Sequence, residues 1–407
     1  AGLTYMGTRV LALPFIRHRS LPHEVLHTWW GNGVLVGYAQ GNWAEGLTTF
    51  MADYALAERR DAAKARGMRL GWLRDYAALP ANRDHPAADF IAKRHDAAQV
   101  IGYNKVAFLF YMLRRDIGAP AFETALREFW QAHKLRDAGW PDLRKSFEDA
   151  AGHDLGWFFD QWLDRRGAPS LRLDTLHARR QGKGYRVSLR IAQDQPPYAL
   201  SIPVRITTDH GNEMFTATLR NTAETFSFFT KGKPSGIAVD PDFAVFRRLD
   251  PRETPPIIRD VTLRSDVSTL ILADTPPATA MARRLAERLL DTPPRFINPD
   301  PRPSPAAPLL IIGLTDQVRL FLKRSGLPAV PERLATRGTA RVWAARHNGV
   351  PLLVVAANDG EALAALLRPL PHYGRKSYLL FSKDKAQESG VWPAPPGPLH
   401  AAVHLGK

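Results

Sequence analysis

Apolar residues recur along this chain with three different periods, and this change constrains the fold more than any other feature. As far as about residue 168 they follow the three- and four-residue spacing of amphipathic helices. From about Ser170 they alternate with polar residues, as in half-buried strands, and beyond Pro255 they form short continuous runs, as in buried parallel strands. The chain is therefore predicted to be a multidomain α+β protein, with domains at residues 1–168, 169–254 and 255–407.

Each of the three domains has its own predicted architecture. The first is expected to hold one strand within residues 3–17 and then helices at 21–31, 43–60, 86–97, 102–116, 119–133, 139–151 and 154–166. The helix at 102–116 is apolar nearly all round and is expected to be central and buried. The second domain is predicted to be a small antiparallel β-sandwich. The third is predicted to be a βαβ arrangement with helices at 277–290, 315–325 and 360–368 and a proline-rich linker at 292–307.

A metal-ligand pattern lies in the first of these helices. Residues 23–27 read His-Glu-Val-Leu-His, and Glu45 follows His27 after seventeen residues. Positions i and i+4 share one face of a helix, so His23 and His27 can hold one metal ion with Glu24 beside them as a base. Glu45, predicted in the first turn of the next helix, completes the shell of three protein ligands that catalytic zinc uses. Thr49 and Asp53 are expected to face the same side and to support the ligands.

The segments at residues 23–32 and 42–48 carry a family resemblance. Their sequences, His-Glu-Val-Leu-His-Thr-Trp-Trp-Gly-Asn and Asn-Trp-Ala-Glu-Gly-Leu-Thr, resemble the gluzincin metallopeptidases of the aminopeptidase N and leukotriene hydrolase type. The resemblance implies a thermolysin-like helical catalytic half and one zinc ion held by His23, His27 and Glu45. The stretch between His27 and Glu45 is one residue shorter than is usual in the family, which a shorter loop at 33–41 would explain.

The resemblance also implies the catalytic roles. In such a site zinc polarises the scissile carbonyl and acidifies a water, Glu24 removes the water proton and delivers it to the leaving amine, and a tyrosine stabilises the oxyanion. Residues 101–107, Ile-Gly-Tyr-Asn-Lys-Val-Ala, match the family's Tyr-x-Lys-Gly context, except that Val106 replaces the glycine. Tyr103 is therefore predicted to be the oxyanion donor.

The substrate class is less constrained than the reaction. The family's exopeptidases bind the free amine of the substrate through a Gly-x-Met-Glu-Asn motif, which by the resemblance would precede Ala1. The chain is therefore expected to be a piece of a longer protein and to have weak or no activity alone. An aminopeptidase is favoured. The alternatives are an endopeptidase that does not recognise the amino terminus and a non-catalytic binding or scaffold protein with a vestigial zinc site.

Composition excludes some further classes. The chain of 407 residues has no cysteine, which excludes disulfides and thiol catalysis, and no apolar run long enough to cross a membrane. Its formal net charge is +15, but the basic residues are dispersed along the sequence, so a peptide substrate is expected rather than nucleic acid. Attraction to anionic membranes or acidic peptides is left open. So are the oligomeric state and the localisation, with a bacterial periplasm or cell envelope favoured over the cytoplasm.

Overall fold

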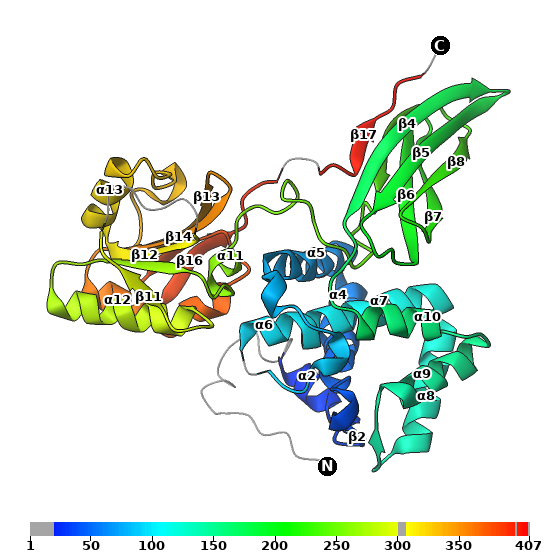
Figure 1. The fold of residues 1–407 in the computed structure, drawn as a ribbon, viewed down its shortest axis with the longest axis horizontal. Coiled ribbons are helices and arrows are strands. Elements are labelled where there is room, and N and C mark those ends of the chain that lie inside the picture. The colour runs from blue at the N-terminus through cyan, green and yellow to red at the C-terminus, as the bar shows by residue number, and fades with distance from the viewer. Residues whose placement is uncertain (1–19, 94, 300–306, 395–396, 406–407) are drawn as a thin grey trace. The chain divides into compact units, whose positions relative to one another are not determined.

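The computed structural model describes residues 20–93, 95–299, 307–394 and 397–405. The chain forms two compact units. The first holds the described residues up to Tyr76, then Arg83–Glu253 and the C-terminal segment from residue 397. The second holds Ala77–Asn82 and the described residues from Thr254 to 394. The mixed content of helices and several sheets agrees with the predicted α+β class, while the division into three domains remains a prediction (Figure 1).

The N-terminal part of the first unit is built mainly from helices. Its longer helical stretches are α2 (Ser20–Leu26), α3 with η3 and α4 (Ala44–Thr48, Thr49–Tyr54, Ala55–Arg60), α5 (Ala62–Ala78), α6 with η6 and α7 (Asp96–Gln99, Val100–Lys105, Val106–Ile117), α8 (Ala119–His133), α9 (Trp140–Ala151) and α10 with η7 (Gly156–Phe159, Asp160–Asp164). The segments η3, η6 and η7 are π-helical turns. Short turns η2 (Tyr38–Gln40) and η5 (Ala87–Asp89) and a small parallel sheet of β1 (Trp30–Gly31), β2 (Val34–Val36) and β3 (Asp137–Ala138) complete this part. The short turn η4 (Ala81–Arg83) begins in the residues of the second unit.

Two of the predicted helices have wrong boundaries, and one helix was not predicted. The helix expected at 21–31 ends at Leu26, because Trp30 leaves the helix to enter strand β1 and packs against Trp43 and Phe129. The segment 86–97 holds only the short turn η5 and the start of α6. Helix α5 was not predicted because Arg69 and Asp75 lie on its buried side, which obscures its apolar face. The strand expected within residues 3–17 lies outside the described residues.

Helix α7 is the centre of this helical core, as predicted. Phe108 is fully buried, and its ring lies 6.1 Å from that of Trp72 and 5.5 Å from that of Phe246. Edge-to-face pairs of this kind recur through the core, and such pairs add to the stabilisation from apolar burial. The core therefore forms a closely packed support beneath the helices that carry the site.

A sandwich of two antiparallel sheets follows the helices in the first unit. One sheet has the order β4-β5-β8, and the other has the order β17-β9-β6-β7. The strands are β4 (Leu171–Gln181), β5 (Gly184–Gln193), β6 (Leu200–Thr208), β7 (Gly211–Leu219), β8 (Ala223–Thr230), β9 (Pro234–Val239) and β17 (His400–Ala402). Strands β4, β5, β6 and β8 lie where alternation predicted them, whereas β7, β9 and β17 were not foreseen.

Buried polar groups join the sandwich to the helices. Arg247 donates to the carboxylates of Asp240 and Glu253 at 2.9 and 2.8 Å, and all three side chains are buried. Arg69 on α5 donates to the backbone carbonyls of Asp242 and Phe243 in the same segment. A buried charge that loses its partner is costly, so these bonds fix the segment at 240–247 against α5.

The second unit is a seven-stranded sheet with the order β11-β10-β12-β14-β13-β15-β16. Its strands are β10 (Ser268–Leu272), β11 (Arg295–Ile297), β12 (Leu309–Leu314), β13 (Ala340–His347), β14 (Val350–Ala357), β15 (Tyr378–Ser382) and β16 (Lys385–Gly390). The predicted strands β10, β12 and β14 are parallel, and helices α12 (Pro276–Leu289), α13 (Thr315–Arg324) and α14 (Gly360–Leu366) follow them as expected. The prediction missed the antiparallel strands β13, β15 and β16, and it assigned the edge strand β11 to a linker.

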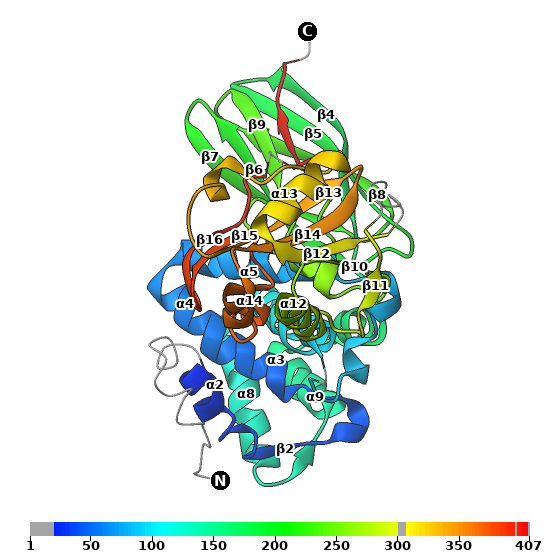
Figure 2. The ribbon, with the colours of Figure 1, turned by 90° about the vertical axis from the view of Figure 1, so that its left-hand side faces the viewer.

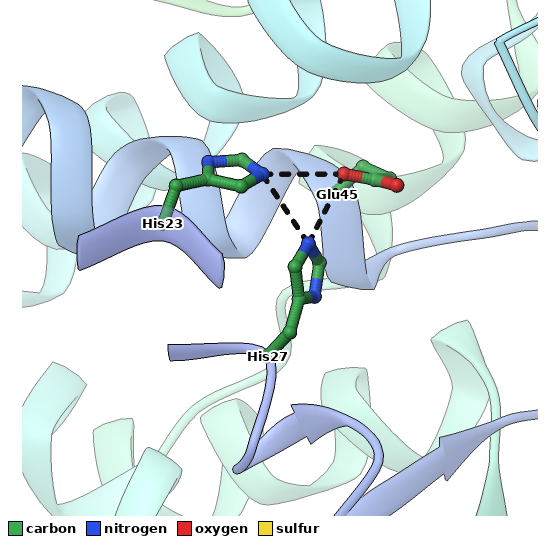
Figure 3. Close-up of side chains that lie close together, drawn as sticks. All are labelled: His23, His27 and Glu45. Atoms are coloured by element: carbon green, nitrogen blue, oxygen red, sulfur yellow. Dashed lines mark hydrogen bonds and ion pairs between the residues drawn. The ribbon is translucent and has the colours of Figure 1, made fainter. Parts of the chain in front are cut away.

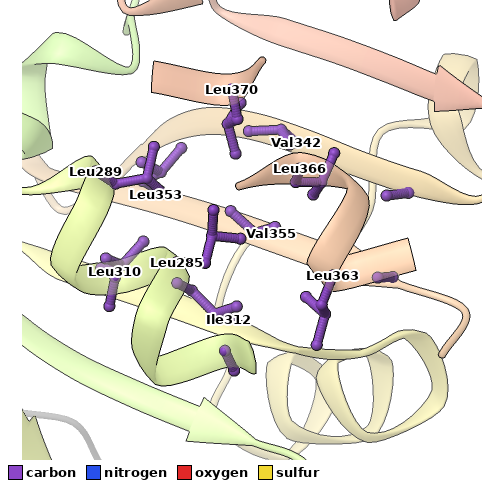
Figure 4. Close-up of a cluster of buried hydrophobic side chains, with 14 of the residues drawn as sticks. Leu285, Leu289, Leu310, Ile312, Val342, Leu353, Val355, Leu363, Leu366 and Leu370 are labelled. Atoms are coloured by element: carbon purple, nitrogen blue, oxygen red, sulfur yellow. The ribbon is translucent and has the colours of Figure 1, made fainter. Parts of the chain in front are cut away.

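Helices cover both faces of this sheet (Figure 2). Helices α12 and α14 pack on one face, where Leu285, Leu363 and Val355 belong to one buried cluster (Figure 4). Helix α13 packs on the other face through Val318 and Phe321. The unit therefore has its own apolar core. Separately, no helix in the described part of the chain is long and apolar enough to span a bilayer.

Candidate metal centre

Three predicted ligands meet at one point in the first unit (Figure 3). His23 lies on α2, His27 follows the last residue of that helix, and Glu45 lies in the first turn of α3. The Nε2 atoms of His23 and His27 are 3.2 Å apart. Glu45 Oε2 lies 3.4 Å from His23 Nε2 and 3.3 Å from His27 Nε2. The three donor atoms therefore form a nearly equilateral triangle.

This triangle fits a tetrahedral metal ion. Bonds of about 2.0–2.1 Å at tetrahedral angles place neighbouring donor atoms about 3.3–3.4 Å apart, which is the spacing found here. Glu45 Oε2 is also a buried oxygen without a geometrically acceptable hydrogen-bond donor among the described residues. A buried acceptor in that state is costly unless something binds it. Two imidazoles and one carboxylate are a usual donor set for zinc.

The far nitrogen of each imidazole is held by an acceptor. His23 Nδ1 lies 2.9 Å from Asp53 Oδ2, and His27 Nδ1 lies 2.8 Å from the backbone carbonyl of Trp30. An imidazole that donates from Nδ1 presents the lone pair of Nε2, so both rings are oriented to bind a metal ion. The contact from Asp53 agrees with the sequence-based expectation. The carbonyl of Trp30 was missed, because no side-chain pattern in the sequence reports a backbone acceptor.

A π-helical turn places Asp53 on the same side as Glu45. The two residues are eight apart, and an α-helix alone would rotate them well out of line. Asp53 lies within η3, so one α turn and one π turn separate it from Glu45. A π turn holds about one residue more than an α turn, and the two together take about eight residues. Thr49, in the same turn, donates to the backbone carbonyl of Glu45 at 2.8 Å rather than to a ligand side chain. It therefore supports the helix and not the imidazoles.

The three side chains titrate as a coupled group when no metal is bound. Burial opposes protonation of His23, but its bonds to Asp53 and Glu45 outweigh burial and raise its pKa to about 9. The pKa of His27 is raised in the same way, against burial, by Glu45 and the carbonyl of Trp30. Burial also opposes ionisation of Glu45, yet the two imidazoles lower its pKa to about 2. Protons thus hold the cluster together, and a metal ion would displace them.

Tyr103 lies beside this cluster on η6. Its ring is nearly parallel to that of His23, with the centroids 6.3 Å apart, and its phenol interacts with the Glu45 carboxylate. Burial, and then the charge of Glu45, raise the pKa of the phenol, so it stays protonated and remains a hydrogen-bond donor. Glu24 has an exposed side chain on α2, and its charge also acts on Tyr103.

Close backbone packing brings Tyr103 to the cluster. A side chain at Gly46 would overlap Val106, and one at Gly102 would overlap the ring of Phe90. Only glycine lets helix α3 approach the η6–α7 segment this closely, and the contact sets Tyr103 near Glu45. The structure thus brings His23, His27, Glu45 and Tyr103 together, with Glu24 next to His23 in the chain.

The segment that carries this cluster is similar to known proteins. Residues 19–162 match the model of the peptidase family M1 domain. Glutamyl aminopeptidase of Bos taurus is 26% identical over 247 residues, which cover 56% of this chain and 25% of that protein. Aminopeptidase N of Lactococcus lactis subsp. lactis is 27% identical over 171 residues, which cover 38% of this chain and 19% of that protein.

A solved structure also matches. The structure of Legionella pneumophila aminopeptidase A in complex with aspartic acid has a TM-score of 0.41 and 20% identity, covering 59% of this chain and 27% of that chain. The present chain spans about a quarter or less of the length of the two curated relatives named above. Residues 19–162 are thus similar in sequence to the peptidase family M1 domain, and both relatives named above are aminopeptidases.

Proposed function

We propose that this chain belongs to a zinc-dependent metallopeptidase that hydrolyses peptide bonds and acts as an aminopeptidase. The triangle of His23 Nε2, His27 Nε2 and Glu45 Oε2 carries the proposal, because its edges of 3.2–3.4 Å match the donor spacing of a tetrahedral zinc ion. Two supporting features are the oriented imidazoles and the buried carboxylate oxygen that faces both of them. A chance meeting of polar side chains would not require either of them.

Each remaining residue has a role of its own. A zinc ion held by His23, His27 and Glu45 would supply Lewis-acid chemistry, polarising the scissile carbonyl and acidifying a water. Glu24, exposed one residue after His23, would accept a proton from that water and return it to the leaving amine. Tyr103, whose phenol stays protonated, would donate a hydrogen bond to the developing oxyanion.

The named relatives favour cleavage at the amino terminus over cleavage within a chain. Both curated proteins are called aminopeptidases, and the segment that matches the family model includes every residue proposed here for the metal and for the chemistry. The chain covers only a small part of those proteins, so the selection of the substrate terminus is inferred from them.

Metal binding is tested on this chain. We expect one zinc ion per chain by elemental analysis, and we expect its loss in His27→Ala. Glu24→Gln should keep the ion, because Glu24 is not a ligand. A chain that binds no zinc, or that binds it equally well after His27→Ala, would overturn the proposed site.

Hydrolysis is tested in the full-length natural protein. Leucine p-nitroanilide should be hydrolysed and N-acetyl-leucine p-nitroanilide should not, and a chelator should abolish turnover. Glu24→Gln should lower kcat by about 10²–10⁴-fold with zinc still bound. Glu123→Gln is the matched control on the exposed side of α8 and should be neutral. Equal cleavage of the acetylated substrate would instead indicate an endopeptidase.

A further inference from the structure

Three turns of the sandwich gather at the same end. Gln181 of β4 pairs with Gly184 of β5, so the turn between them is short. Thr230, the last residue of β8, pairs with Tyr185 next to this turn. Thr208, the last residue of β6, pairs with both Gly211 and Pro234, which places the β6–β7 and β8–β9 turns together. Residues 179–186, 209–210 and 231–233 therefore form one end of the sandwich, here called the cationic end.

Exposed basic side chains dominate the cationic end. They are Arg179, Arg180, Lys183, Arg186, Lys231 and Lys233. Among the described residues none of the six makes an ion pair, and the acidic residue of the three turns is Asp209. Arg179 lies directly across from Arg186 in the ladder, a like-charge pairing that costs stability in the isolated sheet. A cost of this kind is relieved when an anionic surface covers the pair.

Charges elsewhere on the same sheet are paired. Arg172 lies 2.7 Å from Asp194, and Arg190 lies 3.7 Å from Asp174. That opposite end also joins the helical part, since Gln161 exchanges two hydrogen bonds with the backbone of Ala199. Among the described arginines of the β4-β5-β8 sheet, those without an ion pair thus lie at the end of the strands away from this junction. Local concentration of this kind is not a consequence of the basic composition alone.

We infer that the cationic end docks the protein on an anionic phospholipid bilayer. The six cations lie on β4, on β5, in the β4–β5 turn and in the β8–β9 turn, which crosses from one sheet to the other, so they spread over an area rather than along a line. A planar array of phosphate headgroups complements such an area. Phe229 is 52% exposed and its ring lies over Gly184 at the same end, where an aromatic ring suits the bilayer interface.

Nucleic acid is the less suitable polyanion here. Single strands are bound by several aromatic rings that stack on successive bases within a basic groove. At the cationic end Phe229 is the exposed large aromatic residue among those described. The proposed docking does not depend on the metal centre, since none of its residues contacts the metal ligands.

Binding to vesicles tests the inference. The chain should cosediment with vesicles of 70% phosphatidylcholine and 30% phosphatidylglycerol, and not with pure phosphatidylcholine vesicles. Binding should weaken steeply between 0.1 and 0.5 M salt because exposed charges are screened. The triple variant Lys183→Glu, Lys231→Glu, Lys233→Glu should bind about 100-fold more weakly or worse.

A matched variant separates the patch from the overall charge. Arg59→Glu, Arg60→Glu, Lys64→Glu changes the net charge equally at exposed positions on α4 and α5, and it should bind vesicles like the unmodified chain. Circular dichroism and zinc content show whether both variants stay folded. Equal loss in the two variants, no binding to anionic vesicles, or tighter binding to a thirty-residue oligothymidine than to vesicles would each overturn the inference.

Discussion

The two sides of the candidate metal centre are packed very differently. Helix α2, which leads to both imidazoles, has no buried residue, and Val25 on it is 43% exposed. Helix α3, which carries Glu45, buries four of its five residues, and α7 beneath it is largely buried. A seven-residue helix without a buried face is marginal by itself. One side of the centre is thus rigid before metal binds, and the other depends on the contacts of its own ligands.

Core substitution should separate the two sides most strongly. Phe108→Ala removes a fully buried ring from α7 and should lower the free energy of unfolding by about 3–5 kcal/mol. Val25→Ala on α2 should change it by less than about 0.5 kcal/mol. Urea denaturation followed by circular dichroism measures both. Similar losses in the two variants would show that α2 is packed as tightly as α7.

The variant Tyr103→Phe tests whether the phenol on the buried side of the centre takes part in catalysis. This prediction rests on the proposed function. Loss of the phenol oxygen should lower kcat by about 10²–10³-fold, because an oxyanion donor acts mainly in the transition state. KM and zinc content should change little. Tyr38→Phe, at a residue that is 55% exposed, is the matched control. Steady-state kinetics of the full-length natural protein would exclude the role if both variants keep full turnover.

Zinc binding should stabilise α2, the helix without a buried residue, more than it stabilises α7. At a free zinc concentration 100 times Kd, binding adds about 2.7 kcal/mol, which slows exchange of amides that open only in the metal-free state by about 100-fold. We expect this protection for the amides of α2 and of residues 27–30. The amides of α7 should be protected with or without metal. Hydrogen exchange read by mass spectrometry would contradict the comparison if α2 is already protected without zinc.

Asp53→Asn should have the smallest of these effects. The amide keeps the shape of the side chain but loses the charge that holds His23 Nδ1, so zinc affinity should fall about 10–100-fold. Asp137→Asn, at an exposed residue of β3, leaves that bond intact and should bind zinc normally. Competition with a fluorescent chelator measures the affinities. Unchanged affinity in Asp53→Asn would show that α2 does not rely on this contact.

Local patterns in the sequence were enough to predict the convergence of three side chains and the positions of several strands, but not the polar interior. His23, His27 and Glu45 converge because helical spacing and one short loop decide their positions. Helix α5 was missed because its buried side includes Arg69, whose guanidinium bonds to carbonyls more than 170 residues away. The end of α2 was misplaced because Trp30 is buried against side chains that are remote in sequence.

The position of the cationic end was also not predictable from the sequence. The basic residues are dispersed along the sequence, and the cationic end became visible only when strand pairing brought three turns together. Antiparallel strands in the second unit were likewise missed, because Arg341 and Arg346 interrupt the apolar residues of β13 and because the apolar run of β15 is short. Pairing partners distant along the chain decide these features, and a single sequence does not report them.

The π turn at Thr49–Tyr54 has a consequence for comparing such chains by alignment. A helix that admits one extra residue within a turn shifts every later position by one in the sequence while the side chains keep their directions in space. Column-by-column comparison would then set Asp53 against a neighbour of its true counterpart. The carboxylate equivalent to Asp53 in another protein should therefore be found by superposing the two imidazoles and looking for the carboxylate next to them, not by counting residues from Glu45.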